Sequence, residues 1–147
     1  MTKPLFQATM PVVLIGLCGA AGVLARYGMD RLLSRLLGER PLLPTASVNL
    51  LGCFLMGLVL AGFPELPGLR GLPGLAPPGS PWRQAITVGF LGGFTTFSAF
   101  AAEALLLQQQ GNLRAALSYF FLLPAGCVLM VGAGFSVAAR ICGAGAE

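Results

Sequence analysis

The sequence contains no histidine and very few charged residues. Of its 147 residues, 10% are charged and 56% are hydrophobic, and the mean hydropathy is +0.82. Without histidine there is no Ser–His or Cys–His nucleophile pair and no imidazole ligand for a metal. The carboxylates of Asp30 and Glu103 stand singly at the edges of apolar segments, so no paired-carboxylate acid–base site is present. The sequence therefore predicts that this protein is not an enzyme.

Long stretches without any charge make up most of the chain. They cover residues 4–25, 41–64, 84–102 and 115–139. Soluble domains carry about 25% charged residues, whereas a membrane helix needs about 20 consecutive apolar ones. We therefore expect an all-α membrane protein in the cell (plasma or inner) membrane. It forms a single domain over residues 1–147, with four spans near residues 11–27, 44–63, 84–107 and 115–140.

The segments between the spans are basic or rich in proline. A net charge of +4 on a membrane protein indicates basic loops beside lipid headgroups rather than a nucleic-acid partner. Residues 30–38 form a basic amphipathic connector, which we expect to lie in the membrane interface with its leucines toward lipid. Residues 64–81 contain many prolines and glycines and predict an extended loop, whose role the sequence does not indicate.

Cysteines and glycines inside the spans are small residues that suit close helix packing. The four cysteines show no C-x-x-C spacing, so they predict neither a disulfide framework nor a zinc site. They are interpreted as small apolar packing residues: Cys18, Cys53, Cys127 and Cys142.

The third span is interrupted near its middle by Gly92, Gly93, Thr95 and Thr96. Adjacent glycines and β-branched threonines are poor helix formers, so a break in the helix is expected at mid-membrane. Non-helical backbone at this depth is tolerated only where protein or a polar cavity covers it. Its carbonyl groups could hold a monovalent cation. Alternatively, the hydroxyl groups could bond back to these carbonyls in a simple kink. The residues alone leave both interpretations open.

The sequence Gly-Gly-Phe-Thr-Thr-Phe-Ser at residues 92–98, followed by Phe100, resembles the signature of the Fluc (CrcB) family of fluoride channels. Two other motifs agree with this resemblance. The first span ends in G-x-x-G-x-x-x-R-Y at Tyr27, and the second contains V-N-x-x-G-x-F from Val48. The three motifs follow one another in the family's order.

The resemblance implies an antiparallel, dual-topology homodimer that exports fluoride passively across the membrane and so lowers cytoplasmic fluoride toxicity. It also implies one structural Na⁺ at the dimer interface, held by the main-chain carbonyls of Gly92 and Thr95. Fluoride and membrane lipid are the other expected partners. The hydroxyls of Thr96 and Ser98 would add hydrogen-bond donors for the anion. The expected pore residues are Asn49, Phe97, Phe100, Ser98, Thr96, Tyr119 and Arg26.

Without the resemblance, several of these residues have structural interpretations. Asn49 could pin helices together, Phe97 and Phe100 could be apolar core, and Arg26 could reach toward lipid headgroups. The fourth span departs from the family because Leu123 and Cys127 stand where polar residues often continue the pore. These residues leave the donors in the far half of the pore unassigned.

The distribution of basic residues provides a separate indication of topology. Four spans place the cations in two groups, one with Lys3, Arg70, Arg83 and Arg140, the other with Arg26, Arg31, Arg35, Arg40 and Arg114. This near balance favours insertion in both orientations, and leaves open whether a second homologue could replace one copy. The alternative functions are a small multidrug-type antiporter and a structural membrane subunit. A small multidrug-type antiporter needs a carboxylate within a span, and a structural membrane subunit does not explain the broken third span.

Overall fold

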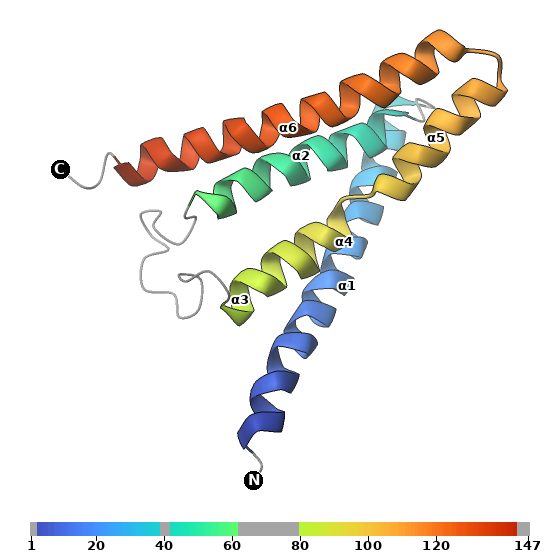
Figure 1. Ribbon diagram of the computed structural model, residues 1–147. Coiled ribbons are helices and arrows are strands. Elements are labelled where there is room, and N and C mark those ends of the chain that lie inside the picture. Colours follow the sequence, from blue (N-terminus) through green and yellow to red (C-terminus); the bar gives the residue numbers. More distant parts are fainter. Residues whose placement is uncertain (1–2, 39–41, 62–79, 144–147) are drawn as a thin grey trace.

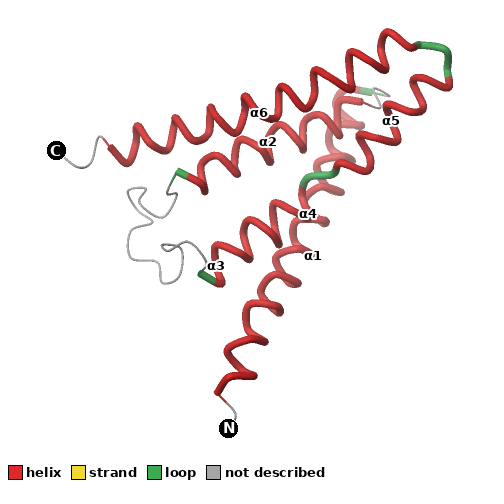
Figure 2. The backbone as a smooth tube through the Cα atoms, in the orientation of Figure 1, coloured by secondary structure: helices red, strands yellow, loops and turns green. Residues whose placement is uncertain are grey.

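The computed structural model describes residues 3–38, 42–61 and 80–143, and every regular element in these ranges is helical (Figures 1 and 2). Four helical stretches are long and apolar enough to cross a membrane: Met10–Leu36, Leu42–Leu60, Pro81–Gln109 and Leu113–Ile141. The structure thus has four long apolar helices, one at each predicted span. The predicted loop over residues 64–81 lies almost wholly outside the described residues. The elements are α1 (Lys3–Leu37), α2 (Leu42–Leu60), α3 (Pro81–Gln84), η2 (Ala85–Leu91), α4 (Gly92–Phe94), α5 (Phe97–Gln109) and α6 (Leu113–Gly143).

Helix α1 is longer than the sequence predicted. The connector expected to lie separately in the interface is the last part of one continuous helix that ends at Leu37. No proline interrupts this part of the chain, and the Arg31 guanidinium lies 5.9 Å from the centre of the Tyr27 ring, one turn away. The helix is terminated at Gly38, which has a φ of 70°. This left-handed conformation closes a helix C-terminus and favours glycine.

The helices form two packed pairs that diverge from one end of the molecule (Figure 1). Helix α1 packs along α3, η2 and α4, whereas α2 packs along α6 and runs parallel to it. Glycines bring the backbones together in both pairs, as small residues do in membrane proteins. A Cβ atom on Gly22 would meet the carbonyl oxygen of Phe90, and one on Gly57 would meet that of Val131. These glycines have the packing role that the sequence predicted.

The third span is broken, as predicted, but the threonines rather than the glycines form the break. Thr95 (φ −84°, ψ 159°) and Thr96 (φ −149°, ψ 114°) are extended, and the helix resumes at Phe97 as α5. Gly92 is helical, with φ −63° and ψ −36°, and Gly93 lies in α4. Before the break, residues 85–91 form a wider π-helical segment. Figure 2 shows the break as a loop between α4 and α5, and α2 contacts the third span on both sides of it.

Much of the apolar surface is exposed rather than buried. The buried apolar residues near the break include Val48, Phe94 and Phe100, whereas large side chains on every long helix are exposed. In water such a surface would cause aggregation. In a bilayer it can face lipid tails or a second subunit, as the predicted membrane location requires.

Candidate functional site at the helix break

Asn49 fastens the break in the third span to α2. Its side chain is only 8% exposed and makes two hydrogen bonds with the backbone of Thr96. The Asn49 Nδ2 group donates to the Thr96 carbonyl oxygen at 2.9 Å, and the Thr96 N–H donates to Asn49 Oδ1 at 2.7 Å. The amide oxygen therefore gives the Thr96 N–H a partner from another helix, in place of the backbone acceptor that the break removes. One Nδ2 hydrogen is left for a further acceptor, because an amide NH₂ carries two donors.

The side chain of Thr96 caps the helix that follows the break. Its Oγ1 atom accepts a hydrogen bond from the Ala99 N–H at 3.2 Å and lies 3.2 Å from Ser98 Oγ. An extended threonine at this position is a favourable N-cap. The cap leaves the α5 N-terminus, with its partial positive charge, beside the hydroxyls of Thr96 and Ser98.

These two arrangements affect the carbonyl groups that the resemblance assigned to Na⁺. In a continuous helix the Gly92 carbonyl would accept from the Thr96 N–H, and the Thr95 carbonyl from the Ala99 N–H. Here both N–H groups donate to side-chain oxygens instead. The backbone therefore frees two hard oxygen donors at the break, and the chemistry of this donor set fits an alkali cation.

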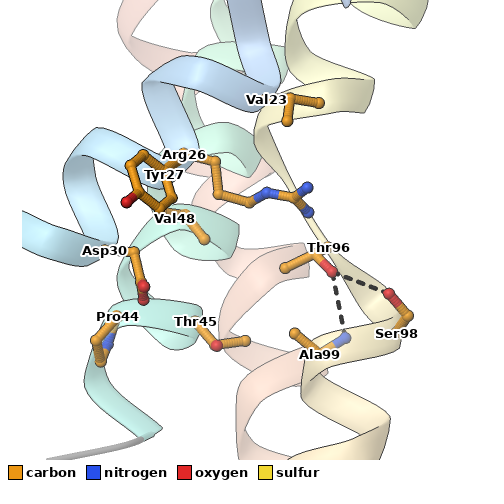
Figure 3. A pocket seen from close by; sticks show the side chains of 10 residues that line it. All are labelled: Val23, Arg26, Tyr27, Asp30, Pro44, Thr45, Val48, Thr96, Ser98 and Ala99. Atoms are coloured by element: carbon orange, nitrogen blue, oxygen red, sulfur yellow. Dashed lines mark hydrogen bonds between the residues drawn. The ribbon is translucent and has the colours of Figure 1, made fainter. Parts of the chain in front are cut away.

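A first cavity of about 570 Å³ opens on one side of the break. Figure 3 shows Arg26 extending from α1 across it toward the Thr96 region, with the Asp30 side chain away from that guanidinium. Its polar lining includes both Arg26 and the hydroxyl residues Thr96 and Ser98. The cavity therefore offers an anion the Arg26 cation and neutral hydroxyl donors, and its wall also includes the carboxylate of Asp30.

A second, smaller cavity of about 280 Å³ shares Thr96 with the first cavity. It brings together predicted pore residues from α2 and the third span with residues of α6. Leu123 and Cys127 are part of its wall. The departures noted in the fourth span therefore fall in the same cavity as the predicted pore residues. Its lining residues are Asn49, Cys53, Thr95, Thr96, Phe97, Phe100, Leu123, Pro124 and Cys127.

Phe97 and Phe100 differ in their surroundings although both line this cavity. Phe97 is 74% exposed and Phe100 is 3% exposed, with their ring centres 5.4 Å apart. Phe100 also packs against Tyr119, at 5.2 Å between ring centres. Phe100 is held by its neighbours, whereas Phe97 has room for contact with another molecule.

Glu103 of α5 forms hydrogen bonds with residues of two other helices, α2 and α6, next to this site. The sequence pattern did not indicate this role. The Thr45 hydroxyl donates to Glu103 Oε1 at 2.6 Å, and the Tyr119 hydroxyl donates to Glu103 Oε2 at 2.6 Å. Glu103 was expected at the edge of the third span but lies inside the apolar stretch Pro81–Gln109. The four-residue spacing of Thr45 and Asn49, which puts both on one face of α2, is the sequence signal that could have indicated this cluster.

We expect Glu103→Gln to destabilise the protein by about 1.5–3 kcal/mol, the usual value of hydrogen bonds to a charged group. An amide has only one acceptor oxygen, so one of the two hydroxyls loses its acceptor. Thermal unfolding in detergent measures the effect, and Tyr119→Phe is the matched variant. In the double variant the single amide oxygen can still accept from the Thr45 hydroxyl, so the double variant should lose less than the sum of the single losses. Full additivity would contradict a Glu103 carboxylate shared by the two hydroxyls.

The structure brings most predicted site residues to the break. Arg26, Thr96 and Ser98 line the first cavity, and Asn49, Thr96, Phe97 and Phe100 line the second. Tyr119 contacts Phe100 and Glu103 instead. Gly92 is exposed, one turn before the break. The roles of these residues in conduction stay predictions.

Comparison with known proteins identifies relatives over most of the chain. The family model of CrcB-like protein, Camphor Resistance (CrcB), matches residues 13–135. A protein of Acidobacterium capsulatum is 38% identical over 132 residues, which cover 90% of this chain and 98% of the relative. One of Paracoccus denitrificans is 44% identical over 105 residues, 71% of this chain and 75% of the relative. One of Vibrio vulnificus is 43% identical over 98 residues, 66% of this chain and 70% of the relative. All three bear the name fluoride-specific ion channel FluC.

The family match and these relatives agree with the motifs at Tyr27, Val48 and residues 92–98. The four helices capable of crossing a membrane lie largely within the matched range or beside it, and the protein is a multi-pass protein of the cell membrane. The chain belongs to the CrcB family of membrane channel proteins.

Proposed function

We propose that this chain forms a fluoride-specific ion channel that lets fluoride leave the cell passively. The observation that carries the proposal is the pair of cavities that share Thr96, one lined by Arg26 and Ser98 and the other by Asn49 and Phe97. The names of the relatives support the same ion. The activity is transport rather than catalysis, as the sequence predicted.

The groups around the break suit a small, strongly hydrated anion. Fluoride gives up its water only if strong donors replace it, and the channel would offer them in sequence. Arg26 attracts the anion, the hydroxyls of Thr96 and Ser98 donate to it, and the free Nδ2 hydrogen of Asn49 follows. The edges of the Phe97 and Phe100 rings carry positive potential. A low-dielectric wall strengthens each of these contacts.

Fluoride efflux from liposomes that contain the purified protein tests the function directly. Fluoride should leave down its gradient, whereas chloride under the same conditions should stay inside. A proton ionophore should not be required, since a passive channel needs no coupled ion once a potassium ionophore balances the charge. Efflux that depends on a pH gradient would favour the antiporter, and no efflux would contradict the proposal.

The proposal includes an antiparallel homodimer of dual topology. Gly92 supports it, because it is exposed and a Cβ atom there would come no closer than 3.7 Å to another group, the Thr87 carbonyl oxygen. Its helical φ does not require glycine. A close approach by a second subunit would explain the small residue. The balance of basic residues between the two sides supports insertion in both orientations.

A structural Na⁺ at the dimer interface is the last part of the proposal. The carbonyl oxygens of Gly92 and Thr95 would hold it. In a continuous helix the N–H groups of Thr96 and Ala99 would donate to these two oxygens, but here they donate to side-chain oxygens instead. When bound, the ion would supply a fixed positive charge between the two subunits. The protein's own contribution is to keep the break open through Asn49 and the Thr96 cap.

We expect Gly92→Leu to weaken dimerisation by at least about tenfold, because overpacking an interface costs about 1–3 kcal/mol and each 1.4 kcal/mol is tenfold. The monomer should tolerate the change, since leucine is the better helix former and the site is open within the chain. Subunit exchange in liposomes, measured by fluorescence energy transfer, gives the dissociation constant. Gly132→Leu is the control, because a Cβ atom on Gly132 would meet nothing within 4 Å in the chain, and one on Gly92 would make only the ordinary contact at 3.7 Å. A dimer unaffected by Gly92→Leu would contradict contact through this surface.

A further inference from the structure

Two cysteines share the wall of the second cavity. Cys53 on α2 and Cys127 on α6 both line the 280 Å³ space that is also lined by Asn49 and Phe97. Both are free thiols of intermediate exposure. Neither residue has a role in the proposed conduction of fluoride, and a sulfur atom is a poor donor to a small anion.

The packing of α2 against α6 holds the two thiols together. The helices touch through their backbones at Gly57, where a Cβ atom would meet the carbonyl oxygen of Val131. Cys53 lies four residues before Gly57, and Cys127 four residues before Val131. Because residues four apart share a helix face, both cysteines lie on the facing surfaces, just beside the closest approach. Short side chains can meet there because the helix axes are close.

The chemistry of the pair indicates a soft cation. Thiolates select soft metal ions such as Cu⁺ rather than hard ions. In the described part of the chain, no cluster of three or more His, Cys, Asp or Glu residues could hold a metal, so the four ligands that Zn²⁺ prefers are not available. Two sulfur ligands in an apolar wall suit an ion that is stable with a coordination number of two. We propose that Cys53 and Cys127 form a two-coordinate binding site for soft monovalent cations of the Cu⁺ and Ag⁺ class.

Binding would change both the charge and the space of the cavity. Each sulfur forms one bond to the metal and releases one proton to solvent, and no electron is transferred. Two thiolates and one monovalent cation leave a net charge of −1 beside Asn49. This charge would repel an anion at close range in a low dielectric, and the metal would occupy part of the cavity. A bound metal ion should therefore block fluoride flux. This block rests on the proposed function, whereas the proposal of the metal site does not rest on it.

Silver titration of the full-length protein tests the site independently of transport. The background variant Cys18→Ala/Cys142→Ala keeps only the pair and should bind one Ag⁺ per chain, seen as sulfur-to-metal absorption in the ultraviolet. Adding Cys53→Ala or Cys127→Ala should each weaken binding by at least about 100-fold, because the second ligand acts at a high effective concentration. Restoring Cys18 to the background should not tighten binding. Equal affinity in either single variant would overturn the two-thiol site.

Fluoride efflux with silver nitrate in chloride-free buffer tests the block. Ag⁺ should stop efflux through the background variant, a thiol competitor should restore it, and the Cys53→Ala/Cys127→Ala variant should stay open. Silver binding at one per chain with unchanged efflux would overturn the block while supporting the site. A protein that binds silver but never conducts fluoride would instead contradict the proposed function.

Discussion

Asn49→Asp should reduce fluoride flux by about 1000-fold. The carboxylate would stand in the second cavity, where the wall is mostly apolar. Two like charges about 4 Å apart repel by about 4 kcal/mol at an effective dielectric constant of 20, which corresponds to that factor in rate. The same change removes the donor to the Thr96 carbonyl, because an ionised carboxylate only accepts hydrogen bonds. Liposome efflux measures the loss.

Asn49→Ala separates the effect of the added charge from the effect of losing the hydrogen bonds between Asn49 and Thr96. It removes both hydrogen bonds with Thr96 but adds no charge, so it should retain measurably more flux than Asn49→Asp. Size-exclusion profiles should show that both variants remain folded. Normal conduction by Asn49→Asp would show that the anion does not pass this residue. An equal loss of fluoride flux in both variants would assign the effect to the lost hydrogen bonds alone.

Gly134→Val should destabilise the protein by more than about 3 kcal/mol, enough to prevent recovery of a monodisperse protein. A Cβ atom on Gly134 would meet the carbonyl oxygen of Phe54 and lie 3.1 Å from the Leu58 nitrogen. Both are backbone atoms, so no side-chain rotation can relieve the clash, and α2 and α6 must separate. The yield and the thermal unfolding temperature in detergent measure the effect.

Gly132→Val is the matched control two residues away on the same helix. It makes the same chemical change, but its Cβ atom would meet nothing within 4 Å. It should therefore fold in normal yield. A milder comparison is Gly126→Ala, whose Cβ atom would lie 3.1 Å from the end of the flexible Leu50 side chain. Similar losses for Gly132→Val and Gly134→Val would mean that the β-branched side chain, rather than the helix contact, causes the damage.

The spans and the broken third helix could be predicted because they depend on local composition. A run of apolar residues has one stable solution in a bilayer, and glycines and threonines weaken a helix wherever they occur. The exact break could not be predicted from these preferences. Gly92 is helical, and the break is at Thr95 and Thr96, because the Thr96 N–H has a better partner in the side chain of Asn49. That partner lies on another helix.

The parts of the site that could not be predicted depend, like the exact break, on contacts between helices. Motifs indicated Asn49 and Phe97, but the contacts of Glu103 with Thr45 and Tyr119 join three helices, and spacing along the chain does not give their relative rotation. The meeting of Cys53 and Cys127 depends in the same way on how α2 and α6 pack. The full length of α1 was missed because basic residues suggested an interfacial segment, although nothing between Tyr27 and Leu37 stops a helix.

The parallel packing of α2 and α6 also determines the order in which the molecule can be assembled. The ribosome synthesises α2 long before its partner, since the whole third span lies between them in the sequence. Until α6 has entered the bilayer, the surface of α2 around Gly57, which contacts Val131 of α6, lacks its partner and faces lipid. Helices in membranes first insert and then associate, so the second step here waits until α6 has been synthesised. Nascent chains arrested before α6 should therefore remain open to proteases and to misplaced helices, and completion of α6 commits the fold.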